Sequence, residues 1–271
     1  MRNAWLIIAH NEFEVLQRLV AALDGPESDF FVHIDRKVRQ LPVLRVEKGR
    51  LFLLAERRDV RWGSVSQIEV ELHLLETALA KGPYGHYHLL SGTHMPLQPL
   101  GSLNDFYAAH PDEEIVRRWA PDPGDADFKL RRWHFPLRHF KSGSPLQQRL
   151  CQLAWRCVIR FQKATGLRHL KNEKFIKTDN WLSVTEKACR FLVGRRDAIV
   201  RKYRWSFCGD EYFAATELAA AGGFRLLDCP QLLHVEFQRD TPKTFPLSAL
   251  PALQATGRLW ARKFTSRPTG E

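Results

Sequence analysis

Short apolar runs alternate with amphipathic segments along the N-terminal third of the chain, and this alternation constrains the fold most strongly. Four runs have the length and apolar content of buried strands: 4–9, 29–34, 51–54 and 87–90. Two segments between them repeat apolar residues at helical spacing: 13–23 and 68–79. This order predicts an α/β fold, with a mostly parallel central sheet and helices on both faces. Ligands of such sheets bind at the carboxyl ends of the strands, where Asp35 and His94 fall.

The rest of the chain predicts one domain rather than two. A chain of 271 residues with 44% hydrophobic content can bury one large core, and it contains neither an internal repeat nor a low-complexity linker. Later elements are expected as helices at 186–201 and 211–221, and as strands at 224–227 and 232–235. We therefore assign residues 1–271 to a single domain with a basic helical insertion at about 128–177.

The insertion at 128–177 differs from the rest of the chain in charge. It holds 13 Lys or Arg residues against one acid, Glu173. An apolar stripe at helical spacing runs through it: Leu146, Leu150, Leu153, Cys157 and Phe161. A basic amphipathic helix of this kind can lie in an anionic membrane interface. Alternatively, the stripe packs on the domain and leaves a solvated basic face; the sequence allows both interpretations.

The charge and the cysteine content limit the classes of binding partner and the cellular compartment that we expect. The net charge of +11 favours nucleotide diphosphates, nucleic acid or anionic lipid as partners. The five cysteines form no CxxC pair and no zinc-binding spacing, which favours a reducing compartment. The apolar runs are too short for a membrane span or a signal peptide. We expect a cytoplasmic protein that can associate peripherally with the inner face of the membrane.

Several short motifs occur in a fixed order over nearly the whole chain: Leu6–His10, Asp29–Asp35, Trp62–Ser64, Glu69–Leu72, Tyr87–Gly92, Pro96–Leu97, Asn180–Ser183, Asp210–Glu211, Pro242–Phe245 and Ala261–Phe264. Together they resemble the core-2/I-branching β-1,6-N-acetylglucosaminyltransferase family, which also contains peptide O-xylosyltransferases. The resemblance implies a GT-A-like fold, an inverting mechanism and a UDP-sugar donor, with no divalent metal. The family often has Gly-Ser-Gln-Trp where this chain has Thr178–Trp181, so the donor sugar and the acceptor stay open.

The loop after the fourth strand offers an independent check on the metal. Metal-dependent enzymes of the GT-A fold place an Asp-x-Asp there, but residues 91–96 contain no acid, and magnesium prefers carboxylate ligands. The Asp125-Ala-Asp127 segment matches the three-letter pattern, although it lies in a later Pro/Gly loop. We expect no cofactor and no metal site, with a metal-dependent, retaining transferase that uses Asp125 and Asp127 as the alternative.

Displacement at an anomeric carbon needs a base for the acceptor hydroxyl, and a carboxylate is the usual choice. The resemblance assigns this role to Glu211, which follows Asp210 in the family's Asp-Glu position. The plainer interpretation is that both acids only complement a helix N-terminus. The fallback carboxylates are Glu217 and Glu236.

Without a metal, cationic side chains must neutralise the leaving diphosphate. The resemblance assigns Lys263 to this role. The second cation is less defined, with Lys243 as the nearest match and Arg239 and Arg262 as alternatives. A solvated basic tail is the competing interpretation of this segment.

The resemblance also implies which residues lie near the donor nucleotide and which lie near the acceptor. Asp35 and His10 would contact the donor nucleotide, His10 through its backbone. Asp179, Asn180 and Trp181 would lie on the acceptor side.

The expected function is the transfer of GlcNAc or xylose from a UDP-sugar to a glycan hydroxyl, as in surface polysaccharide assembly, with an acceptor that can be lipid-linked. A nucleic-acid-binding protein is the non-enzymatic alternative, because the chain is basic and rich in Trp. No RNA- or DNA-binding signature supports it, so we expect no nucleic-acid partner.

Overall fold

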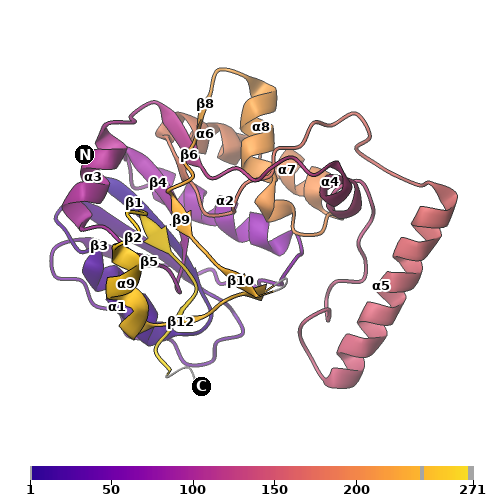
Figure 1. Ribbon diagram of the computed structural model, residues 1–271, viewed down its shortest axis with the longest axis horizontal. Coiled ribbons are helices and arrows are strands. Elements are labelled where there is room, and N and C mark those ends of the chain that lie inside the picture. The colour runs from indigo at the N-terminus through magenta and orange to yellow at the C-terminus, as the bar shows by residue number, and fades with distance from the viewer. Residues whose placement is uncertain (1, 239–240, 268–271) are drawn as a thin grey trace.

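A computed structural model describes residues 2–238 and 241–267 of the chain. Within these residues, seven strands form the central sheet in the order β3-β2-β1-β4-β7-β6-β8 (Figure 1). Their bounds are β1 Asn3–Ala9, β2 Ser28–Ile34, β3 Arg50–Leu53, β4 His86–Ser91, β6 Glu113–Val116, β7 Ser183–Val184 and β8 Arg225–Asp228. Only β7 runs antiparallel to its neighbours in this sheet. The predicted α/β architecture with a mostly parallel sheet is confirmed.

Helices cover both faces of the sheet because β1 is apolar on both sides. Trp5 and Ile7 face a core shared with α1 (Phe13–Ala22), α3 (Leu100–Ala108) and α9 (Leu250–Gln254). Leu6 and Ile8 face the opposite core. That second core is closed by four helices: α2 Ser66–Leu79, α6 Glu186–Gly194, α7 Arg196–Tyr203 and α8 Phe213–Ala221. Every residue of β1 and β2 is buried, as strands of a doubly covered parallel sheet require.

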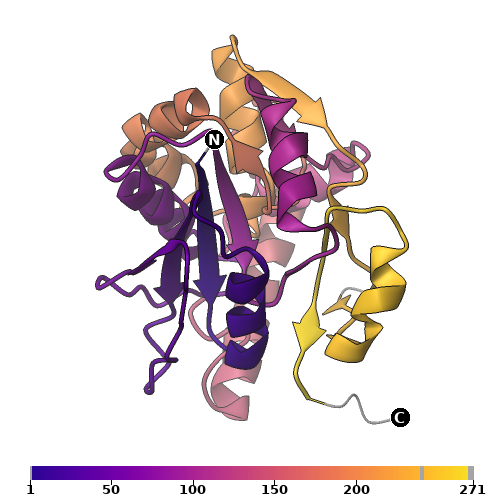
Figure 2. The ribbon, with the colours of Figure 1, turned by 90° about the vertical axis from the view of Figure 1, so that its left-hand side faces the viewer.

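The C-terminal segment returns to the carboxyl end of the sheet (Figure 2). There β13 (Trp260–Ala261) joins β5 (Met95–Pro96) and β9 (Leu233–His234) in a small second sheet. The Phe264 N–H donates to the Thr93 carbonyl at 2.9 Å. Arg262 and Lys263 are thereby held next to the loop that follows β4. Two further pairs complete the segment: β10 (Phe237–Gln238) with β11 (Thr241–Pro242), and β12 (Phe245–Pro246) with β14 (Phe264–Thr265).

Two local expectations differ from the structure. The single helix expected at 186–201 is two helices, α6 and α7, which meet at Arg195 beside the poor helix former Gly194. The helix expected from residue 211 begins at Phe213, and Gly209–Glu211 form a separate 3₁₀ turn, η1. A second 3₁₀ turn, η2, spans Leu247–Ala249.

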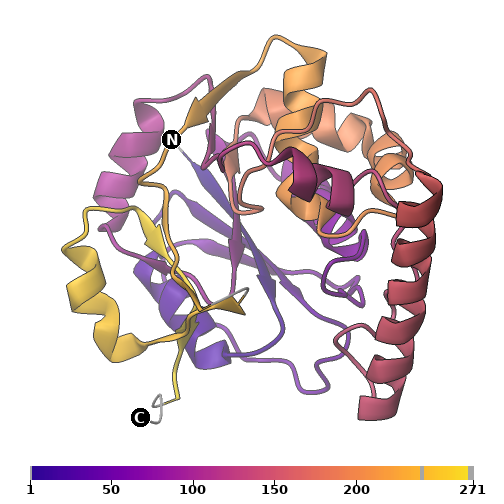
Figure 3. The ribbon, with the colours of Figure 1, turned by 45° about the vertical axis from the view of Figure 1, so that its right-hand side comes forward.

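The basic insertion contains one long helix at the edge of the molecule, α5 (Pro145–Thr165), preceded by the short helix α4 (Pro123–Lys129) (Figures 1 and 3). Ser144 starts α5 with a capping box in which its side chain and that of Gln147 satisfy each other's backbone N–H groups. Gly166 ends the helix at φ 69°, a left-handed conformation that favours glycine. Among the described residues, no helix is both long and apolar enough to cross a membrane.

Candidate active site

Glu211 lies in the η1 turn, between α7 and α8, with its side chain 32% exposed. The Lys129 ammonium donates to Glu211 Oε2 at 2.7 Å, and Lys177 Nζ lies 4.0 Å from the same oxygen. Burial alone would lower the pKa of Lys129, but the Glu211 charge outweighs it and holds that pKa above its ordinary value. The Thr178 N–H donates to the Glu211 carbonyl at 2.9 Å, which ties the turn to the predicted acceptor segment. Glu211 is therefore a fixed carboxylate that remains open to solvent.

Asp125 lies in the same network, although no sequence pattern predicts that it lies near Glu211. Its carboxylate accepts from the Tyr212 hydroxyl at 2.5 Å and from Lys177 at 2.6 Å, and Lys129 Nζ lies 3.3 Å away. Asp127 instead pairs with Arg132 at 3.1 Å and Arg168 at 2.8 Å. Each carboxylate of the Asp125-Ala-Asp127 pattern is thus already paired with two cations. This arrangement fits a divalent metal poorly, because the ion would have to displace those partners.

Two more carboxyl groups are buried beside Glu211. Asp210 is 9% exposed, and burial together with the Glu211 charge raises its pKa to about 7. Glu71, on α2, is fully buried, and neither of its carboxyl oxygens has a hydrogen-bond partner within the described structure. Burial, and then the charge of Asp210, raise the pKa of Glu71 well above its ordinary value, while the Asn180 side chain acts in the opposite direction. The fold therefore favours the protonated form of Glu71 more than water does.

Glu71 was missed by the sequence reasoning, although a signal for it exists. It occupies the apolar face of α2, between Ile68 and Leu75 at helical spacing. An acid on such a face is unusual, because a buried carboxyl without a cationic partner costs free energy.

Arg262 approaches this group of acids from the C-terminal segment, where Lys263 follows it in the chain. The Arg262 guanidinium lies 4.9 Å from the Trp181 ring centre. Burial lowers the pKa of Arg262 to about 10, while Asp179 and Asp210 act in the opposite direction. The Lys263 carbonyl accepts from the Phe245 N–H at 2.8 Å, which fixes the backbone there. Arg262 therefore shares an electrostatic environment with Asp210, the neighbour of Glu211.

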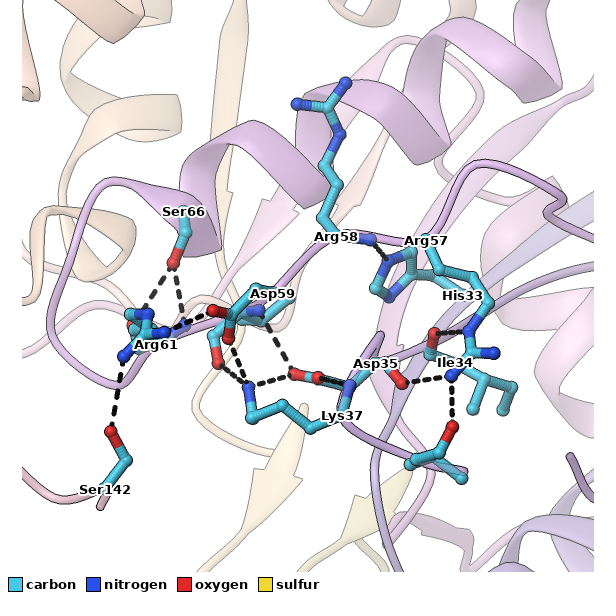
Figure 4. A network of polar contacts seen from close by, with 12 residues as sticks. His33, Ile34, Asp35, Lys37, Arg57, Arg58, Asp59, Arg61, Ser66 and Ser142 are labelled. Atoms are coloured by element: carbon cyan, nitrogen blue, oxygen red, sulfur yellow. Dashed lines mark hydrogen bonds and ion pairs between the residues drawn. The ribbon is translucent and has the colours of Figure 1, made fainter. Parts of the chain in front are cut away.

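The predicted nucleotide residues His10 and Asp35 interact with each other, and His10 also interacts with Lys263. Partial burial and then the Lys263 charge lower the pKa of His10, while Asp35 acts in the opposite direction. The Asp35 carboxylate is buried and accepts from the Lys37 N–H and ammonium, each at 2.8 Å, and from the Val60 N–H at 3.1 Å (Figure 4). Asp35 thus joins the end of β2 to the segment after β3.

The acceptor-side residues form one strip next to Arg262. Asp179 accepts a bidentate pair from Arg117, at 2.5 and 2.9 Å, and a third hydrogen bond from Trp119 at 3.0 Å. Trp181 is buried, and no partner for its indole N–H is found in the described residues. All three of these hydrogen bonds come from the chain itself, so the Asp179 carboxylate is largely engaged within the protein.

The remaining candidates are not brought into this group. Lys243 pairs with Glu236 at 2.9 Å on the β10–β11 hairpin. Glu217 is buried and faces α7, where it pairs with Lys202 at 2.8 Å, which removes it as a base for an incoming substrate. Arg239 lies outside the described residues. Within the described residues, no group of three or more His, Cys, Asp or Glu side chains could hold a metal ion.

Comparisons with known proteins identify the family of this chain. A segment of 107 residues, 38% of the chain, is 27% identical to the xylosyltransferase oxt of Drosophila melanogaster, of which it covers only 12%. The structure aligns over 99% of its length with the apo form of mouse xyloside xylosyltransferase 1, with a TM-score of 0.41 and 8% identity. The family model described as Core-2/I-Branching enzyme matches residues 3–235. Because that match runs from the first residue of β1 past the end of β9, the chain belongs to the Core-2/I-Branching enzyme family.

Proposed function

We propose that this enzyme is an inverting glycosyltransferase that moves a sugar from a UDP-sugar donor to a glycan hydroxyl without a divalent metal. One observation carries the proposal. The partly exposed carboxylate of Glu211 lies beside a buried acid, Asp210, which in turn interacts with Arg262, the first residue of the Arg262-Lys263 pair. A base and two cations are the groups that direct displacement at an anomeric carbon requires.

In the proposed reaction, Glu211 accepts the proton of the acceptor hydroxyl as its oxygen bonds to the anomeric carbon. The bond from that carbon to the diphosphate oxygen breaks on the opposite face, so the configuration inverts. Negative charge grows on the departing UDP, and Arg262 and Lys263 stabilise it most where it is largest. Lys129 holds the Glu211 carboxylate in place without occupying all of its lone pairs.

Two features support a metal-free reaction. The loop after β4 carries no acid, and both carboxylates of the alternative Asp125-Ala-Asp127 pattern are paired with cations. In the metal's place, the chain presents two basic side chains, Arg262 and Lys263. The metal-dependent alternative would require Asp125 to leave both Lys177 and Tyr212.

The donor sugar is proposed to be GlcNAc or xylose. The motif resemblance described in the sequence analysis supports the first, and the name of the Drosophila relative supports the second. We propose a surface polysaccharide as the product, a lipid-linked glycan as the acceptor, and a cytoplasmic enzyme at the inner face of the membrane. The charge of the 128–177 insertion supports this location, because 13 basic residues against one acid favour an anionic surface.

A donor screen tests the reaction. Purified protein is offered UDP-GlcNAc, UDP-xylose, UDP-glucose and UDP-galactose with simple glycan acceptors, and released UDP is measured. The anomeric configuration of the product is then read by NMR. A β-linked product from an α-linked donor is expected, whereas an α-linked product would contradict the inverting mechanism.

A further inference from the structure

We propose that the outer face of helix α5 docks on an anionic membrane surface. This outer face consists of Leu146, Leu150, Leu153, Cys157 and Phe161, which follow one another at helical spacing. Its large side chains are open to solvent: Leu146 is 65% exposed, Leu150 58%, Leu153 59% and Phe161 62%. An apolar stripe that is exposed along most of a helix usually marks an interaction site.

The stripe is available because the opposite side of α5 holds the helix to the protein. Cys151 and Ile159 are buried on that side. Gln162 is also buried, and its amide exchanges two hydrogen bonds with the Trp133 backbone, at 2.9 and 2.8 Å. The Trp155 indole N–H donates to His134 at 3.0 Å. Packing of the stripe on the domain is therefore excluded, since the helix already rests on its other face (Figure 3).

A row of bases accompanies the outer face. Arg149, Arg156, Arg160 and Lys163 are all exposed. None of them forms an ion pair with another described residue, and α5 contains no acid between Pro145 and Thr165. Their positive charges are thus uncompensated by the protein.

The combination of apolar and basic side chains indicates which kind of partner binds the outer face of α5. Both kinds of side chain gain favourable contacts with an anionic bilayer. The apolar side chains enter the boundary of the acyl chains, while the basic side chains contact the anionic headgroups. A second copy of α5 could cover the leucines, but it would bring two rows of uncompensated positive charge together. A nucleic acid would match the charge and leave the leucines in water. Anionic lipid is the partner that fits both features.

Aromatic contacts connect the docked helix to the active site. Trp155 packs against Phe140 and Phe207, with ring centres 5.1 and 6.0 Å apart. Phe207 precedes Asp210 and Glu211 in the same short loop. Arg61, before α2, also contacts the insertion. It donates to the Arg138 carbonyl. It also donates to the Ser142 hydroxyl (Figure 4). If the acceptor is carried on a lipid, which rests on the function proposed above, docking would bring Glu211 close to the surface that holds it.

Vesicle binding tests the proposal without any need for turnover. The full-length protein is mixed at low salt with vesicles of phosphatidylcholine alone, or of phosphatidylcholine with about one third phosphatidylglycerol, and is then floated on a density gradient. Cys157 also serves as a native labelling site, because it is the exposed cysteine among the five and the other four are buried. An environment-sensitive dye at Cys157 should shift to the blue with the anionic vesicles only.

Two quadruple variants distinguish binding through the outer face of α5 from binding through the net charge of the whole protein. Changing Arg149, Arg156, Arg160 and Lys163 to Gln should weaken binding by roughly tenfold or more. The control changes four other exposed bases to Gln, namely Arg39, Arg45, Lys48 and Arg201, and should bind much as wild type does. UDP release with a soluble acceptor should be unchanged in both, so a failure of docking can be distinguished from a failure of the proposed reaction.

Three results would overturn the proposal. One is equal recovery with neutral and anionic vesicles, and another is equal weakening by the two quadruple variants. The third is a concentration-dependent dimer that is lost in Leu150→Ser/Leu153→Ser, since it would assign the outer face to a second copy of the chain.

Discussion

At the scale of single residues, the account depends most on Glu211. Glu211→Gln keeps the size of the side chain but removes its capacity to take a proton. Transfer should fall by about 10²–10⁴-fold while UDP affinity stays near wild type. Glu236→Gln, which alters an exposed carboxylate on the β10–β11 hairpin, is the matched control and should keep its activity. Near-wild-type turnover by Glu211→Gln would remove Glu211 as the base.

Lys263 should act on both binding and chemistry. Lys263→Ala is expected to weaken UDP affinity and to lower the turnover number as well, because charge on the leaving diphosphate grows toward the transition state. Lys243→Ala, in which the lost ammonium is paired with Glu236, should change neither quantity much. Steady-state kinetics with isothermal titration of UDP separates the two effects. A loss of UDP affinity at constant turnover would reduce Lys263 to a binding residue.

Glu71 should make the stability of the protein depend on pH. Burial raises the pKa of its carboxyl in the folded protein, whereas in the unfolded chain the carboxyl ionises above about pH 4.3. The folded state therefore binds more protons, and stability falls as pH rises from that value toward the raised pKa of the folded state. Glu71→Gln removes this loss, so its melting temperature should exceed wild type by roughly a few degrees near neutral pH and by little near pH 4. A constant difference across this range would show that Glu71 does not titrate as inferred.

The site residues differ in how far the sequence could predict them. Glu211, Arg262 and Asp35 are matched by short motifs, and the structure places Arg262 near Asp210 and Asp35 near His10. Lys129 and Lys177 could not be found in this way, because they reach Glu211 from distant parts of the chain and carry no motif. Their positions depend on tertiary packing of α4 and of the segment after α5.

At the scale of elements, α5 has two faces with different tasks. Trp155 points inward, where its ring meets Phe128, Phe140 and Phe207. Leu153, two positions earlier, is 59% exposed. Trp155→Ala should lower the free energy of unfolding by about 2–3 kcal/mol and open the insertion to proteolysis. Leu153→Ala should change stability by less than about 0.5 kcal/mol. Chemical denaturation of both variants measures this contrast, and equal losses would contradict the orientation of α5.

Element positions could be predicted where apolar periodicity was strong. The strands β1, β2 and β4 and the helices α1 and α2 follow from their patterns within a few residues. The break between α6 and α7 could not, since Leu192 and Ile199 continue the same apolar pattern across it. The η1 turn is similar, because nothing in Gly209–Glu211 distinguishes a 3₁₀ turn from the first turn of α8. Local hydrogen bonding decides these points, and it is not visible in periodicity.

Across the whole molecule, the excess positive charge and the candidate active site lie in different parts of the fold. The insertion holds 13 bases against one acid, although the chain as a whole has a net charge of +11, so the remainder is close to neutral. The candidate site lies at the carboxyl edge of the sheet, between the body and the C-terminal segment that carries Arg262 and Lys263. One fold thus presents a basic helix at its edge and a candidate site in which most charged side chains are paired within the chain. The sequence predicted the asymmetry, but only the structure showed which side of α5 faces outward.

In the proposed reaction, Arg262 and Lys263 take the place of a divalent metal. The most direct measurement is UDP release by the full-length enzyme with its best donor and acceptor, in excess EDTA and again with added magnesium. The account predicts equal initial rates under both conditions, because no step needs an ion to neutralise the diphosphate. Activity that disappears in EDTA and returns with magnesium would contradict it.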